Sequence, residues 1–154
     1  MQKQFNLTPF QIDTLRGKVC PYCKCGTRDA SQEEVYNGNS YSKRRMRVCN
    51  NFPHCDAYVG CDDSGIPLGR LARPELRRKR KEAHEVVDQL WKKGYMKRQN
   101  MYKELWKHLG LPKEYTHIGM FGLNTCIRVI MWGNEQLVRF ENAPHGAPFN
   151  NKRR

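Results

Sequence analysis

The sequence predicts a small α+β protein in which a zinc ribbon, made of short β-hairpins around a four-cysteine zinc site, precedes a module of three helices. The ribbon is predicted because six of the seven cysteines fall within residues 20–61, where apolar residues are too few to form a core without a metal. The helices are predicted because apolar residues recur every three or four positions in the second half of the chain, as on the buried face of an amphipathic helix. A length of 154 residues fits one domain or two small modules.

Residues 1–18 are expected to form an N-terminal segment that contains a short helix. Thr8 is a favourable N-cap, because its hydroxyl oxygen can accept a hydrogen bond from an N–H group of the first turn. Pro9 suits the first helical position, where its missing N–H is not needed. This segment would pack its apolar side chains on the next module.

Residues 19–66 are expected to form the zinc ribbon. Asn37-Gly38 is a typical turn of a β-hairpin. The candidate strands are residues 33–36 before this turn, and residues 40–41 and 46–48 after it. Strands of this kind would bring distant cysteines together.

Two cysteine pairs in the ribbon have the spacing of zinc ligands. Cys20 and Cys23 form a C-x2-C pair, Cys49 and Cys55 form a C-x5-C pair, and 25 residues separate the two pairs. Two such turns place four thiolates tetrahedrally around one zinc ion, and four thiolates leave no open position for catalysis. The sequence therefore predicts one structural Zn²⁺ ion bound by Cys20, Cys23, Cys49 and Cys55.

Neighbouring residues leave alternatives for this ligand set. Cys25 competes with Cys23 as a ligand, and His54 lies beside Cys55. A redox-active dithiol of Cys20 and Cys23 is a rival interpretation. A dithiol of that kind follows a strand in a βαβ unit, however, and the sequence pattern indicates no such unit here.

The remaining cysteines and the histidines show no catalytic pattern. Cys61 and Cys126 are interpreted as buried thiols, because a cysteine without a ligand packs as a small apolar residue. His84 is interpreted as a helix-surface residue that bonds Asp88, four positions later. We expect no enzyme activity and no small-molecule substrate, because the sequence lacks a metalloprotease motif, a phosphate-binding glycine loop and paired catalytic carboxylates. A second metal site stays open as an alternative, with the candidate ligands Cys61, His84, His117 and Cys126.

Residues 67–133 are expected to form the helical module. Helices are predicted over residues 74–93, 97–109 and 123–132. The first begins with Pro74, which suits the first turn of a helix, and ends before Gly94. Residues 134–154 include three prolines or glycines near their centre and a basic end, and we expect them to form a flexible basic tail.

The chain is strongly basic. Lys and Arg number 28 against 15 Asp and Glu, which gives a net charge of +13. Residues 43–98 hold 15 of the basic residues and seven of the acidic ones. This surplus favours nucleic acid or an acidic protein surface as a partner. No apolar run reaches the ~18 residues of a membrane span, and the first residues lack the apolar core of a signal peptide, so we expect a cytoplasmic protein that does not contact a membrane.

Basic and aromatic residues occur together in the ribbon, a combination typical of single-strand binding, in which cations contact phosphates and bases stack on rings. In a strand, Arg45 and Arg47 would point to one face and Arg44 to the other. The predicted nucleic-acid-binding residues are Tyr22, Arg44, Arg45, Arg47, Phe52, Arg77, Arg78, Arg80 and Lys81. The alternative is that the rings form the ribbon's own core and that the helix charges pair with one another at i,i+4 spacing.

The two cysteine pairs resemble the C-terminal zinc ribbons of bacterial type IA topoisomerases, which carry C-P-x-C followed by C-x-N-Y-P-x-C. The resemblance covers residues 20–58. This chain departs from the pattern at Phe52, where the ribbons have tyrosine, and at residues 24–26, where glycine normally follows the second cysteine. The resemblance implies contact with single-stranded DNA.

A longer resemblance, over about residues 19–131, is to a family of small zinc-finger-containing proteins found in phages and prophages. The segments that carry it are residues 55–61, 67–72, 83–84, 88–91 and 117–121. It implies the zinc site, the attached helices and the cytoplasm of a bacterial or phage-infected cell. It implies no particular activity.

These observations favour a zinc ribbon of phage type that binds nucleic acid, with single-stranded DNA as the preferred ligand and little sequence specificity. The alternative is a protein-binding zinc adaptor that docks on a host enzyme or defence protein and modulates it. An acidic host surface would attract the same positive charge. Binding of arbitrary oligonucleotides would favour the first hypothesis. Capture of one host protein at high salt would favour the adaptor.

Overall fold

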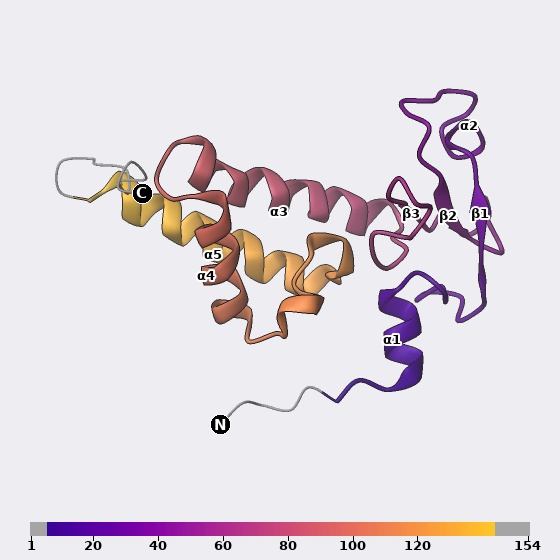
Figure 1. Ribbon diagram of the computed structural model, residues 1–154, viewed down its shortest axis with the longest axis horizontal. Coiled ribbons are helices and arrows are strands. Elements are labelled where there is room, and N and C mark those ends of the chain that lie inside the picture. The colour runs from indigo at the N-terminus through magenta and orange to yellow at the C-terminus, as the bar shows by residue number, and fades with distance from the viewer. Residues whose placement is uncertain (1–5, 144–154) are drawn as a thin grey trace. The chain divides into compact units, whose positions relative to one another are not determined.

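The computed structural model describes residues 6–143 of the 154-residue chain (Figure 1). These residues form two compact units, which we name the ribbon unit (residues 6–77 and 119–121) and the helical unit (residues 78–118 and 122–143). The module boundary predicted from the sequence lies after residue 66. The ribbon unit continues beyond that point because Leu71 is fully buried in the cluster that contains the cysteines of the predicted zinc site.

Helix α1, Pro9–Leu15, begins at the capping residue that the sequence predicts. Thr8 Oγ1 accepts a hydrogen bond from the Gln11 N–H at 3.2 Å, and Gln11 Oε1 accepts one from the Thr8 N–H at 2.9 Å. This reciprocal pair is a capping box, which satisfies two backbone donors at the start of the helix. The predicted N-terminal helix is therefore confirmed.

The ribbon unit contains a three-stranded antiparallel sheet in the order β1-β2-β3. The strands are β1 (Thr27–Ala30), β2 (Met46–Cys49) and β3 (Tyr58–Gly60). Alternate residues of β1 and β2 point to one face, where Ala30, Met46 and Val48 form a buried cluster. The partly buried side chains that cover this cluster are Val35, Tyr36, Phe52 and Tyr58. A sheet followed by helices confirms the α+β class.

The predicted hairpin at Asn37-Gly38 is wrong. Helix α2, Gln32–Val35, occupies most of the expected first strand, because the Ser31 side chain caps it by accepting a hydrogen bond from the Glu34 N–H at 3.2 Å. Asn37 and Gly38 both have left-handed backbone conformations, with φ of 54° and 93°. They reverse the chain after a helix, and β1 pairs with β2 across the long connection between them. The predicted strand at residues 46–48 lies within β2.

The helical unit contains residues 78–92 of α3 (Pro74–Lys92), α4 (Arg98–Leu109), a short 3-10 helix at Lys113–Tyr115, and α5 (Leu123–Glu141). A second 3-10 helix, Ile118–Met120, belongs mostly to the ribbon unit. Helices α3 and α4 agree with the predicted spans within a residue or two. Gly110 ends α4 in a left-handed conformation with φ of 66°, as expected of a C-terminal glycine. The buried side chains of the helical unit include Val87, Leu90, Met101, Leu105 and Val129.

Helix α5 is longer than the sequence predicted. It continues to Glu141, so the first eight residues of the predicted tail, 134–141, are helical, and residues 144–154 lie outside the described residues. Its buried side includes Val129 and Trp132, whereas Met131 is 59% exposed. Gly133 lets α3 approach closely, because a Cβ there would lie 2.6 Å from Val86 Cγ1.

Candidate metal centre

The first cysteine pair lies in a tight turn, residues 20–25, immediately before β1. Backbone hydrogen bonds close this turn: the Cys20 N–H donates to the Cys25 carbonyl and the Lys24 N–H donates to the Cys20 carbonyl, both at 2.9 Å. The Cys23 N–H points at Cys20 Sγ, with 3.5 Å between nitrogen and sulfur. The turn thus places two sulfur atoms together and gives one of them a backbone donor. We name it the first cysteine turn.

The second cysteine pair lies in the connection between β2 and β3, residues 49–55, which we name the second cysteine turn. The same arrangement recurs there: the Asn51 N–H points at Cys49 Sγ, with 3.4 Å between the atoms. The Cys55 N–H donates to the Asn51 carbonyl at 3.0 Å, and the Cys49 N–H donates to the Ala57 carbonyl at 3.0 Å. Pairing of β2 with β1 brings the two turns to the same end of the sheet.

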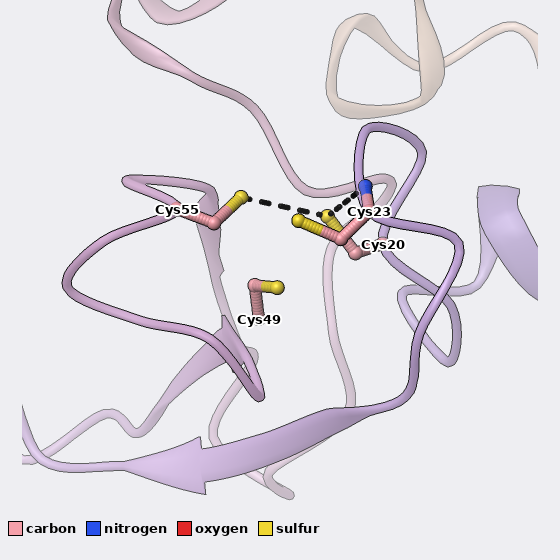
Figure 2. Close-up of side chains that lie close together, drawn as sticks. All are labelled: Cys20, Cys23, Cys49 and Cys55. Carbon is pink, nitrogen blue, oxygen red and sulfur yellow. Dashed lines mark hydrogen bonds between the residues drawn. The ribbon is translucent and has the colours of Figure 1, made fainter.

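The two turns direct four sulfur atoms toward one point (Figure 2). The sulfurs of Cys20, Cys23, Cys49 and Cys55 all lie within 4.8 Å of one another, and those of Cys20 and Cys55 are 3.8 Å apart. With zinc–sulfur bonds of about 2.3 Å, the edges of a tetrahedral four-thiolate site measure about 3.8 Å. The donor set and its spacing therefore fit one zinc ion.

Burial and hydrogen bonding change the acidity of these thiols in opposite directions. Burial raises the pKa of Cys49 and also that of Cys55. The pKa of Cys23 is lowered to about 7, chiefly by the side-chain amide of Asn51. In the metal-free protein the two buried thiols are therefore protonated at neutral pH, and they must lose their protons to bind a metal.

Two neighbours of the ligand set take positions outside it. Cys25 Sγ lies 3.5 Å from Cys49 Sγ and 3.8 Å from Asn51 Nδ2, but it does not belong to the group of mutually close sulfurs. His54 is exposed. The structure therefore brings together the four cysteines that the spacing predicts and leaves Cys25 beside them as a fifth thiol.

Arg73 and Tyr22 form an outer layer over the centre that the sequence analysis did not identify. Arg73 Nη2 lies 3.5 Å from Cys55 Sγ, and this contact raises the pKa of the guanidinium. The guanidinium also lies 4.5 Å from the centre of the Tyr22 ring, and the Arg73 N–H donates to the Tyr22 hydroxyl at 3.1 Å. Outer contacts of this kind orient metal ligands. No local motif marks them, because 51 positions separate the two residues.

The arginines predicted to bind nucleic acid from the sheet have partners within the ribbon unit. Arg44 Nε lies 2.9 Å from Asp63 Oδ1, and Arg45 pairs with Asp29. Arg47 Nε donates to Thr27 Oγ1 at 2.9 Å. These arginines hold strands and turns together in the unbound protein.

Phe52 lies on the face of the sheet opposite to Arg47. It packs, half-buried, against the cluster that contains Met46 and Val48, and these residues alternate along β2 with Arg47. Successive side chains of a strand point to opposite faces, so Phe52 and Arg47 lie on opposite faces of the sheet. Phe52 therefore contributes to the ribbon's own core, and its predicted role in binding nucleic acid stays a prediction.

The basic residues predicted on α3 have three different environments. Arg77 makes its contacts within the ribbon unit. Its Nη1 donates to the carbonyls of Asp56 and Ala72, and its guanidinium lies 3.8 Å from the centre of the Tyr58 ring. Arg80 is only 9% exposed, so it is not the surface residue that was predicted. Arg78 and Lys81 are exposed.

The other candidate ligands do not form a second cluster. Within residues 6–143, the four cysteines are the one group of three or more metal-ligating side chains that meet. Cys61 and Cys126 are buried, as interpreted from the sequence. His84 Nδ1 lies 3.8 Å from Asp88 Oδ2 on α3, which agrees with the predicted pair. None of the described helices is both long enough and apolar enough to cross a membrane.

Comparison with known proteins agrees with the geometry of the centre. Residues 16–136 match the model of a family described as a zinc-finger-containing domain. No curated protein and no solved structure matches the chain. The family match and the four convergent thiols together support the predicted cofactor: the chain holds one structural zinc ion. The likeness to topoisomerase ribbons stays a resemblance of sequence.

Replacing Cys49 with serine is expected to remove the zinc ion, because a buried ligand is lost from a site that needs four thiolates. Cys25→Ser is the matched control, since Cys25 lies beside Cys49 and outside the ligand group. Elemental analysis of protein purified without added metal should find about one zinc per chain in the wild type and in Cys25→Ser. Full retention of zinc by Cys49→Ser, or equal loss by Cys25→Ser, would contradict the assigned ligands.

Zinc affinity is expected to fall as the pH is lowered, because protons compete with the metal for thiolates. Burial raises the pKa of Cys49 and of Cys55, so each of these thiols releases a proton when zinc binds at neutral pH. At least two displaced protons predict an apparent Kd that rises by at least about 100-fold for each unit by which the pH falls. Competition with a coloured chelator at several pH values around neutrality measures this slope. A slope near zero would mean that the thiols are already ionised in the metal-free protein.

Proposed function

Because this chain belongs to the family of zinc-finger-containing domains, we propose that it is a phage-type zinc protein that binds single-stranded DNA with little sequence specificity. In this proposal the zinc ion is structural, since four thiolates occupy all the positions of a tetrahedral site. The protein then binds its ligand without changing it chemically and is not an enzyme. Thiolate-bound zinc fits a reducing compartment such as the bacterial cytoplasm.

The observation that carries the proposal is a positive charge that internal ion pairs cannot remove. The chain has 28 Lys and Arg residues and 15 Asp and Glu residues. Even if every carboxylate paired with a cation, a charge of +13 would remain. Cations on a protein surface neutralise phosphates and release the counterions condensed on nucleic acid, which favours binding.

The ion pairs of Arg44 and Arg45 are compatible with this proposal. The side chains of Arg44 and Arg45 are 51% and 48% exposed, and those of their partners Asp63 and Asp29 are 87% and 51% exposed. Exposed pairs of this kind contribute about 0–1 kcal/mol to stability. A phosphate can therefore replace the carboxylate as the partner of either arginine at a small cost.

A protein-binding adaptor is the second candidate function, and one feature of α5 favours it. Ile127, Met131 and Val138 are 38%, 59% and 55% exposed. Their spacing of four and seven positions puts them on one side of the helix, where they form an apolar stripe of the kind that packs on a partner helix. We prefer nucleic acid because the charge surplus belongs to the whole chain, whereas the stripe comprises three residues of one helix.

Zinc-loaded protein is expected to bind a fluorescent single-stranded oligonucleotide of arbitrary sequence at low salt. The logarithm of the binding constant should fall linearly with the logarithm of salt concentration, by roughly 0.7 for each phosphate contact. Arg78→Ala with Lys81→Ala removes two exposed cations of α3 and should reduce this slope by about 1.4. Fluorescence anisotropy at several salt concentrations measures both quantities.

Gln89→Ala is the matched control for this double variant, because Gln89 is an uncharged residue of the same helix. It should change the slope little. If the wild type binds neither single- nor double-stranded DNA or RNA at low salt, the proposal is wrong. Capture of one stoichiometric protein at high salt, lost in Met131→Glu, would then favour the adaptor.

A further inference from the structure

We infer that the outer surface of the first cysteine turn is the part of the protein that contacts single-stranded nucleic acid. The surface consists of Phe10, Tyr22, Lys24 and Arg73, and we name it the cation–aromatic surface. The inference rests on the proposed function and assigns the site within the ribbon unit. It differs from the sheet surface that the sequence analysis predicted.

Two pairs of a cation and a ring meet at this turn. The Arg73 guanidinium lies 4.5 Å from the centre of the Tyr22 ring, and Lys24 Nζ lies 5.5 Å from the centre of the Phe10 ring. Tyr22 and Lys24 are two positions apart in the turn, so both pairs lie at the same small segment of chain. A ring beside a cation offers a face for a base and a charge for the adjoining phosphate.

Both rings are accessible although they are large and apolar. Phe10 is 45% exposed and Tyr22 is 37% exposed, and Lys24 and Arg73 are exposed as well. Burying a phenylalanine side chain stabilises a protein relative to leaving it exposed, and the buried clusters of this unit are small. Two exposed rings beside two cations are therefore better explained by a ligand than by folding.

The turn is held rigidly, which favours binding. Lys24 has a left-handed backbone conformation with φ of 60°, and its Nζ donates to the Pro21 carbonyl at 2.6 Å. The Arg73 guanidinium contacts Cys55 Sγ, and the Arg73 backbone N–H donates to the Tyr22 hydroxyl. Groups that are already ordered lose less conformational entropy on binding, so the zinc centre prepares this surface for its ligand.

The other exposed aromatic residue of the ribbon unit provides a contrast. Tyr41 is 78% exposed, and its ring makes an edge-on contact with the Tyr36 ring, with 5.4 Å between the ring centres. No cation within the described residues lies over the Tyr41 ring. Tyr41 therefore serves as the matched control for Phe10, and the exposed Lys43 serves as the control for Lys24.

The test compares the affinities of zinc-loaded variants for a labelled strand of deoxythymidines by fluorescence anisotropy. Phe10→Leu removes the stacking ring and keeps an apolar side chain, and it should weaken binding about 5- to 150-fold. Lys24→Ala should reduce the salt slope by roughly 0.7. Tyr41→Leu and Lys43→Ala should each change affinity less than about twofold. Elemental analysis of every variant checks that zinc is retained.

The outcomes separate this inference from the proposed function. If the wild type binds the strand and Phe10→Leu and Lys24→Ala behave like their controls, the inference is wrong and the proposed function stands. If the wild type binds no nucleic acid, both are wrong. A double-stranded competitor that binds as tightly as the single strand would also overturn the inference, because paired bases are not available for stacking on these rings. If Phe10→Leu loses zinc, the salt slope of Lys24→Ala alone decides whether the inference is correct.

Discussion

The bonds between four cysteine sulfurs and one zinc ion are the interaction on which the ribbon unit depends. Its strands are only three or four residues long, and isolated strands of this kind are not stable in water. Its buried clusters are small, and one of them is made largely of the cysteines themselves. Cys20 and Cys23 precede β1, whereas Cys49 and Cys55 flank the connection from β2 to β3. Zinc binding therefore brings together the same chain segments that strand pairing brings together. Zinc binding and strand pairing each make the other more favourable.

The centre also explains why the arginines of one small unit have different roles. Four thiolates and a Zn²⁺ ion carry a net negative charge, and Arg73 beside Cys55 compensates part of it. Arg77 donates to two backbone carbonyls and lies over Tyr58, so it joins the start of α3 to the rest of the unit. Positive charge that remains on the surface is available for a ligand. A count of basic residues in the sequence does not distinguish these roles, because the distinction depends on which carbonyl, carboxylate or sulfur each guanidinium reaches in the folded chain.

The features that the sequence predicted are those set by local spacing. The cysteine intervals identified the ligand set, the Thr8-Pro9 cap identified α1, and the period of apolar residues identified α3 and α4. One failure arose where a local helix cap competes with a hairpin turn, and the others arose where distant contacts decide the structure. Asn37-Gly38 has the composition of a hairpin turn, but Ser31 caps a helix just before it. Gly133 is unfavourable inside a helix, and α5 continues through it because α3 packs closely there. The contact of Arg73 with Tyr22 and Cys55 joins residues far apart in the chain, and no sequence pattern indicates it.

Hydrogen exchange of the protein with and without zinc tests the central claim most directly. Removal of the metal by a chelator should abolish the protection of backbone amides in β1, β2, β3 and both cysteine turns. Buried residues such as Met101, Leu105 and Val129 give the helical unit an apolar core of its own, so amides in α4 and α5 should keep most of their protection. Ribbon amides that stay protected after the zinc has been removed would contradict the account, because the strands would then be stable without the bonds that we hold responsible for them.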